Sequence, residues 1–102
     1  MVNFERVASV GEIKDGGSKI VGAGGRYVAV FNLGGRFYAF ENVCPHMGGP
    51  VGEGFLESGT ITCPLHAWDF DIRTGEAKSM PGQRLNTFEV KVEGDDILVK
   101  VE

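Results

Sequence analysis

Residues 44–68 read CPHMGGPVGEGFLESGTITCPLHAW, and the rest of the sequence is interpreted around them. The chain has two cysteines and two histidines, and all four lie here as two short pairs, Cys44 with His46 and Cys63 with His66. Thiolate and imidazole groups are suited to binding iron, zinc or copper. Two loops that each supply one cysteine and one histidine provide four ligands, which suffice for a tetrahedral ion or for a two-iron cluster.

Two simpler interpretations compete with a shared metal centre. A single buried cysteine behaves as a small apolar residue, and a single histidine is often a packed core group. A disulfide between Cys44 and Cys63 is the second alternative, but it would leave the matching histidines unexplained. The close pairing of all four residues, beside proline and glycine, favours a common inorganic centre.

The two pairs resemble the Rieske motif, in which Cys-x-His is followed by Cys-x-x-His. The spacer in that motif is close in length to the sixteen residues that separate His46 from Cys63 here. Gly48 and Gly49 after the first pair and Pro64 inside the second pair extend the resemblance. It implies one Rieske-type [2Fe–2S] cluster per chain, in which two cysteines hold one iron and two histidines the other. The implied ligands are Cys44 and Cys63 for the inner iron, and His46 and His66 for the outer iron.

The resemblance also implies the fold. We expect a single all-β Rieske domain over residues 1–102, an antiparallel β-sandwich with a cluster-binding subdomain at about residues 43–81 inserted in a base domain. A third loop, Ser79-Met80-Pro81-Gly82, would cover the cluster from another side.

The strand pattern by itself favours an all-β domain, because sixteen glycines separate short apolar runs. The predicted strands are 4–10, 19–22, 26–33, 36–43, 59–62, 67–72, 86–93 and 97–101, with 52–59 as a loose connection. Strand 26–33 is expected to be buried on both faces, and Gly34-Gly35 to form a hairpin turn. The expected inward side chains of the first strand and of the last hairpin are Phe4, Val7, Val10, Phe88, Val90 and Val92, with Ile97, Val99 and Val101 paired against the last three.

Composition and charge exclude several classes of protein. With 102 residues, 42% of them hydrophobic, the chain suits one globular domain, and its net charge of −4 disfavours nucleic acid as a partner. We see no apolar run long enough to span a bilayer and no secretory signal at the first residues, so we expect no membrane partner and a cytoplasmic location.

Residues 44–76 contain one base, Arg73, against five acids, which are either solvated loop charges or a negative collar for basic partners. These acids are Glu53, Glu57, Asp69, Asp71 and Glu76.

The resemblance implies a monomeric one-electron carrier that takes electrons from a flavin-dependent ferredoxin reductase and passes them to a terminal Rieske oxygenase. The chain has no further histidine for a mononuclear iron, so we expect an electron-transfer component and no catalysis of its own. The expected docking face is a tip formed by His46, Met47, Leu65, His66 and Pro81.

Two alternatives remain open from the sequence. The small subunit of assimilatory nitrite reductase is similar in length and in its Cys-Pro-His and Cys-Pro-Leu-His segments. A structural zinc module would use the same four ligands. The colour of the purified protein distinguishes the zinc module from an iron–sulfur protein, because a zinc protein is colourless.

The residues that follow the second ligand pair predict the reduction potential. Respiratory and photosynthetic relatives place hydroxyl groups where this chain has Trp68 and Phe70, and a disulfide where it has Gly49 and Leu65. Without those hydroxyl groups, less of the negative charge of the reduced state is stabilised. We therefore predict a potential near the low end of the range of roughly −150 to +300 mV.

Overall fold

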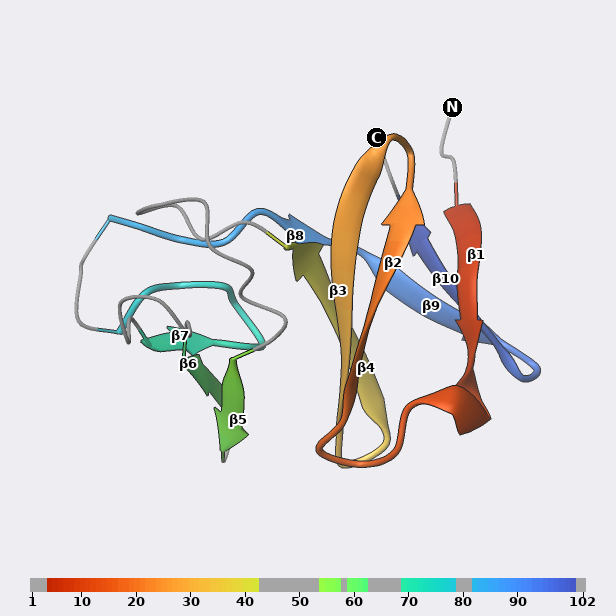
Figure 1. Ribbon diagram of the computed structural model, residues 1–102, viewed down its shortest axis with the longest axis horizontal. Coiled ribbons are helices and arrows are strands. Elements are labelled where there is room, and N and C mark those ends of the chain that lie inside the picture. The colour runs from red at the N-terminus through yellow and green to blue at the C-terminus, as the bar shows by residue number, and fades with distance from the viewer. Residues whose placement is uncertain (1–3, 43–53, 58, 63–68, 79–81, 101–102) are drawn as a thin grey trace.

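The computed structural model describes residues 4–42, 54–57, 59–62, 69–78 and 82–100. These residues form three antiparallel sheets and one short 3-10 turn, η1 (Val10–Glu12), as Figure 1 shows. Sheet A has the order β1 (Phe4–Ser9), β10 (Asp96–Lys100), β9 (Val90–Glu93). Sheet B has the order β2 (Ser18–Ala23), β3 (Arg26–Leu33), β4 (Arg36–Glu41), β8 (Thr87–Phe88), and sheet C the order β5 (Phe55–Glu57), β6 (Thr60–Thr62), β7 (Asp69–Asp71).

Sheet B is the central layer, because successive residues of its strand β3 contribute to two different cores. Val28 and Val30 join Ala8, Ile97 and Val99 in a core shared with sheet A. The residues between them, Ala29 and Phe31, belong to a second core shared with sheet C. The prediction that this strand is buried on both faces is therefore confirmed, except at Tyr27, which is 72% exposed.

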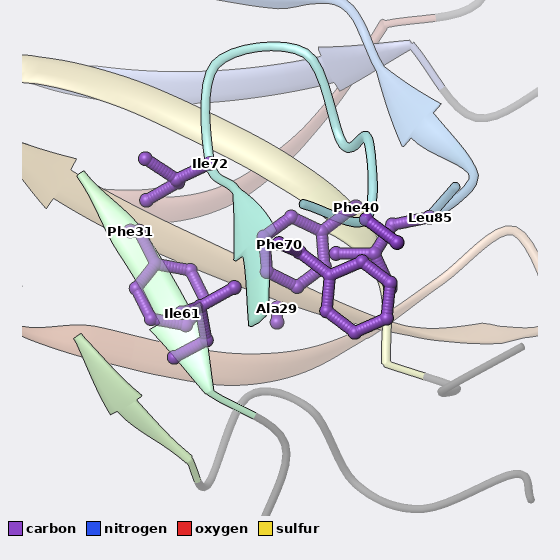
Figure 2. Close-up of a cluster of buried hydrophobic side chains, with 8 residues drawn as sticks. Ala29, Phe31, Phe40, Ile61, Phe70, Ile72 and Leu85 are labelled. Carbon is purple, nitrogen blue, oxygen red and sulfur yellow. The ribbon is translucent and has the colours of Figure 1, made fainter. Parts of the chain in front are cut away.

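The second core joins sheet C to sheet B. Its large side chains are fully buried, and Phe31 stacks on Phe40 with ring centroids 5.1 Å apart. Figure 2 shows these side chains gathered between the strands. The full set is Ala29, Phe31, Phe40, Ile61, Phe70, Ile72, Ala77 and Leu85.

The β3–β4 hairpin turns at Gly34-Gly35 as predicted, with φ of 64° and 90°, values that favour glycine. Asn32, a buried polar residue, fixes this hairpin to the segment after η1. Its side-chain amide donates to the Ile13 carbonyl at 2.9 Å, and its side-chain oxygen accepts from the Gly35 N–H at 2.9 Å.

The predicted strand 86–93 is divided between two sheets. β8 pairs with β4 in sheet B, whereas β9 pairs with β10 in sheet A, so the chain changes sheets at Glu89. The predicted cross-strand pairs Val92 with Ile97 and Val90 with Val99 are confirmed. The inward position of Val92 is wrong, because this side chain is 45% exposed beside a surface hollow that β9 shares with Gly35 and Phe37.

Two further predictions need correction. In the first strand, Val7 packs against the core as predicted, although it is only half-buried. The fully buried residue is Ala8, which follows a shift in the pairing with β10, and Phe4 and Val10 are half-buried. The segment 52–59 is not wholly loose, since Phe55–Glu57 forms strand β5. A three-residue strand has little sequence pattern of its own and is defined by its partner. Val101 lies outside the described residues.

Within the described parts of the chain, no helix is long and apolar enough to cross a membrane.

Candidate metal centre

The four predicted ligands, Cys44, His46, Cys63 and His66, lie outside the described residues, as do Trp68 and Ser79–Pro81. The strands that flank each pair are described, and their ends show where the chain leaves the sheets and where it rejoins them. β4 ends at Glu41, three positions before Cys44, and β6 ends at Thr62, directly before Cys63. β7 begins at Asp69, three positions after His66.

The start of β5, the end of β6 and the start of β7 lie side by side at one edge of sheet C, the edge formed by these strand ends. The first residue of β5, Phe55, pairs with Thr62, and Thr62 pairs in turn with Asp69. After the first ligand pair, the chain therefore joins sheet C next to the strand ends that flank the second pair. The end of β4 is anchored separately, because the Asn42 N–H donates to the Tyr27 carbonyl and the Glu41 N–H to the Asn86 carbonyl, both at 2.8 Å.

The segment before the predicted third loop runs to the same edge. Ala77 bridges to Phe70, and the Lys78 N–H donates to the Asp69 carbonyl at 2.8 Å. Since the bridge is antiparallel, the described segment from Ala77 to Lys78 runs toward the start of β7 at Asp69. The Ala77 N–H also donates to the Gln83 carbonyl at 2.9 Å, which holds the two ends of this third loop together.

Side-chain hydrogen bonds link the strand before the second ligand pair to the segments that follow it. The sequence did not predict this feature. Thr62 Oγ1 donates to Asp69 Oδ1 at 2.6 Å, and the Lys78 ammonium donates to Thr60 Oγ1. From the sequence, Asp69 and Asp71 were expected only to be solvated loop charges or part of a negative collar. In the structure Asp69 and Asp71 are both half-buried, and Asp71 accepts from the Arg73 N–H.

The rigidity of this edge comes from the core beneath it. Ile61 and Phe70, the central residues of β6 and β7, pair with each other and are fully buried against sheet B. In Figure 2 both side chains point into the cluster that also holds Phe31 and Phe40. The short strands of sheet C are thus fixed by tertiary packing more than by their length.

The donor set fits a two-iron cluster of mixed ligation. Two thiolates and two neutral imidazoles balance two ferric irons and two sulfides to a net charge of zero. The start of β5, which follows the first pair, lies beside the end of β6 and the start of β7, which flank the second pair. One small centre shared by all four residues is consistent with this described backbone. Among the described residues no other group of three or more His, Cys, Asp or Glu side chains is placed to bind a metal.

Comparisons with known proteins agree with this arrangement. The family model described as Rieske [2Fe-2S] domain matches residues 3–99. The ferredoxin component of biphenyl 2,3-dioxygenase from Rhodococcus jostii (strain RHA1) is 39% identical over 98 residues, which are 95% of this chain and 92% of that protein. Relatives of this kind are electron carriers that accompany an oxygenase.

Solved structures match over almost the whole chain. The ferredoxin of carbazole 1,9a-dioxygenase from Nocardioides aromaticivorans IC177 has a TM-score of 0.91 and 32% identity, covering 98% of this chain and 99% of that one. A ferredoxin seen in a complex with the reduced oxygenase of carbazole 1,9a-dioxygenase has a TM-score of 0.90 and 32% identity, covering 97% and 94%. A nitrite reductase small subunit matches with a TM-score of 0.84 over 95% of this chain and 97% of that one, but at 17% identity it shows the fold alone.

Proposed function

Because this chain belongs to the Rieske [2Fe–2S] domain family, we propose that Cys44 and Cys63 hold one iron of its cluster and that His46 and His66 hold the other. Its cofactor is a Rieske-type [2Fe–2S] cluster, and the predicted all-β Rieske fold is confirmed. The convergence of β5, β6 and β7 at one edge of sheet C supports the assignment of these four ligands. Residues 43–81 would then form the cluster-binding subdomain.

When bound, the cluster supplies a centre that accepts and releases one electron. The chain's own residues hold the centre still, since little rearrangement of the surrounding protein favours rapid electron transfer. The buried side chains of Ile61 and Phe70 and the paired ends of β6 and β7 serve this purpose.

The protein is the ferredoxin component of a ring-hydroxylating dioxygenase system and carries electrons without oxidising a substrate itself. The observation that carries this conclusion is the 39% identity across 95% of the chain to a dioxygenase ferredoxin. Its proposed donor is a flavin-dependent ferredoxin reductase, and its proposed acceptor is a terminal Rieske oxygenase. We further propose a location in the cytoplasm, because both cysteines are assigned to the cluster and a disulfide framework is then excluded. We also propose a monomer.

Among the described acids of the proposed negative collar, Glu57 and Glu76 are exposed. Asp69 and Asp71 are half-buried and accept local hydrogen bonds, which leave their negative charges in place. Exposed charges of one sign attract an oppositely charged partner over a distance that depends on salt.

Stopped-flow mixing tests the proposed transfer directly. Reduced protein should be reoxidised by a terminal Rieske oxygenase expressed from the source genome, with one electron delivered per cluster. A reduced cluster that persists beside every such oxygenase would contradict the proposed acceptor. In a separate stopped-flow assay of reduction by the reductase, Glu57→Lys should slow the reduction at low salt. Glu5→Lys on β1 makes the same charge change in sheet A and should have less effect.

A further inference from the structure

The second ligand loop, residues 63–68, is bracketed by two half-buried polar side chains that bond to each other. Thr62 directly precedes Cys63 and Asp69 follows His66 by three positions, and the two are partners in the β6–β7 register. Thr62 Oγ1 donates to Asp69 Oδ1 at 2.6 Å. A hydroxyl bound to a carboxylate at this distance is a charge-assisted hydrogen bond, which is stronger than one between neutral groups.

The backbone of each partner in this bond is also held by the neighbouring chain segment. The Asp69 carbonyl accepts from the Lys78 N–H at 2.8 Å, and Thr62 pairs with Phe55 of β5. Below the bond, Ile61 and Phe70 are fully buried. Thr62 and Asp69 therefore project from backbone that is already held in place, so their bond fixes the distance between the two ends of the loop.

The bond lies where the ladder of sheet C ends. β6 and β7 contain three residues each, and Thr62–Asp69 is the last registered pair before the loop. The ends of such short strands open easily, and a side-chain bond at that place opposes the opening. Groups that orient a metal ligand without touching the metal commonly matter almost as much as the ligand itself.

We propose that Thr62 and Asp69 are positioning residues for the cluster: their hydrogen bond sets the orientation of Cys63 and His66 and so controls how firmly iron is held. This inference rests on the ligand assignment proposed above. A purely structural role for the bond makes a different prediction, namely a loss of unfolding free energy with an unchanged cluster.

Four variants separate these roles. Thr62→Val keeps the shape and the β-branch of the side chain and removes the hydroxyl, whereas Thr62→Ser keeps a hydroxyl. Asp69→Ala removes the acceptor, and Thr60→Val is the matched control, because it makes the same change two residues earlier on β6. Two properties of the purified holoprotein are followed: the g values of the reduced state by electron paramagnetic resonance, and the rate of iron loss to a chelator.

Thr62→Val and Asp69→Ala should each lose iron about ten-fold faster than the parent protein and should shift the g values. Thr62→Ser should restore both properties, and Thr60→Val should leave the g values unchanged. If the two residues act through their bond, the double variant should lose iron no faster than either single variant.

The inference is overturned if Thr62→Val has parental g values and a parental rate of iron loss, or if Thr60→Val has an equal effect on both. Independent, multiplying effects of Thr62→Val and Asp69→Ala would also overturn it. Failure of the ligand assignment looks different, because the parent protein itself would then lack a mixed-ligand two-iron signal.

Discussion

At the scale of single residues, Glu12 illustrates how a local contact makes stability depend on pH. A hydrogen bond from Lys19, and after it one from the Ser9 N–H, lower the pKa of the Glu12 carboxyl below its usual value. A carboxylate with a lowered pKa stabilises the native state above the pKa of the unfolded chain, and this stabilisation is lost as pH falls through the folded value.

Glu12→Gln should therefore reduce the difference in thermal midpoint between neutral pH and a pH below about 4, because the glutamine keeps the shape and does not titrate. Circular dichroism melts of both proteins at each pH measure this difference. Glu5→Gln is the control, since Glu5 is exposed on β1 and no ion pair to another described residue is found for it. An equal pH dependence in the parent protein and in Glu12→Gln would contradict the expectation.

Phe70 bears on the reduction potential, which the sequence predicts to be low. Its ring is fully buried in the core under sheet C and carries no hydroxyl group. We predict a midpoint potential in the lower part of the range of roughly −150 to +300 mV for such centres. Redox titration monitored by visible absorbance measures it, and a value above about +150 mV would refute the prediction.

Single residues also show where prediction from sequence ends. The four proposed ligand positions follow from residue type and spacing, because the chain has only these cysteines and histidines. The hydrogen bond between Thr62 and Asp69 does not, since the alternation of β7 gives the side of the strand and not the partner across it. Only the register of β6 with β7 brings those two side chains together.

At the scale of elements, turns and cores determine how sheet C is attached to the base. Gly75, with φ of 81°, follows β7 and lies against β8, where a Cβ atom would come 2.7 Å from Thr87 Cγ2 and 3.0 Å from the Leu85 carbonyl oxygen. Gly94 between β9 and β10 has φ of 61°, and a Cβ there would meet nothing within 4 Å.

Alanine at either position should lower the free energy of unfolding by about 1–2 kcal/mol, because left-handed backbone disfavours a side chain. Gly75→Ala should lose roughly a further 1–3 kcal/mol from the forced contact with Thr87 and Leu85. Urea unfolding of both variants gives the comparison. Equal losses would mean that the space around Gly75 adjusts freely.

The two cores should have separable effects on the cluster. Ile61→Val and Ile97→Val remove the same group from fully buried positions, one in the core under sheet C and one in the core under sheet A. Each should cost about 0.5–1.5 kcal/mol of unfolding free energy. Only Ile61→Val should also speed iron loss to a chelator, and an equal acceleration in Ile97→Val would contradict this division.

The strands predicted with success are the long ones with strong alternation, such as β3, β4 and β10. The missed features depend on tertiary pairing. β5 has three residues and exists through its register with β6, and the division of β8 from β9 at Glu89 follows from the choice of different neighbours in sheets B and A. The alternation of apolar and polar residues continues through residues 86–93, so the pattern alone cannot indicate that the chain changes partners there.

At the scale of the whole molecule, sheet B is the layer that the two cores share. Sheet A packs against it through one core and sheet C through the other. Fold class and cofactor were predictable, because the motif and the Gly-punctuated strands agree with each other. The distribution of exposed charge was not predictable, because it depends on which carboxylates the fold leaves at the surface.

Electron–nuclear double resonance of the reduced protein tests the mixed ligation most directly. The account predicts a two-iron centre of half-integer spin with strong couplings to two imidazole nitrogens, one from His46 and one from His66, and with both couplings lost when the histidines are replaced. A paramagnetic cluster without nitrogen couplings, or purified protein that contains zinc and no iron or sulfide, would contradict it.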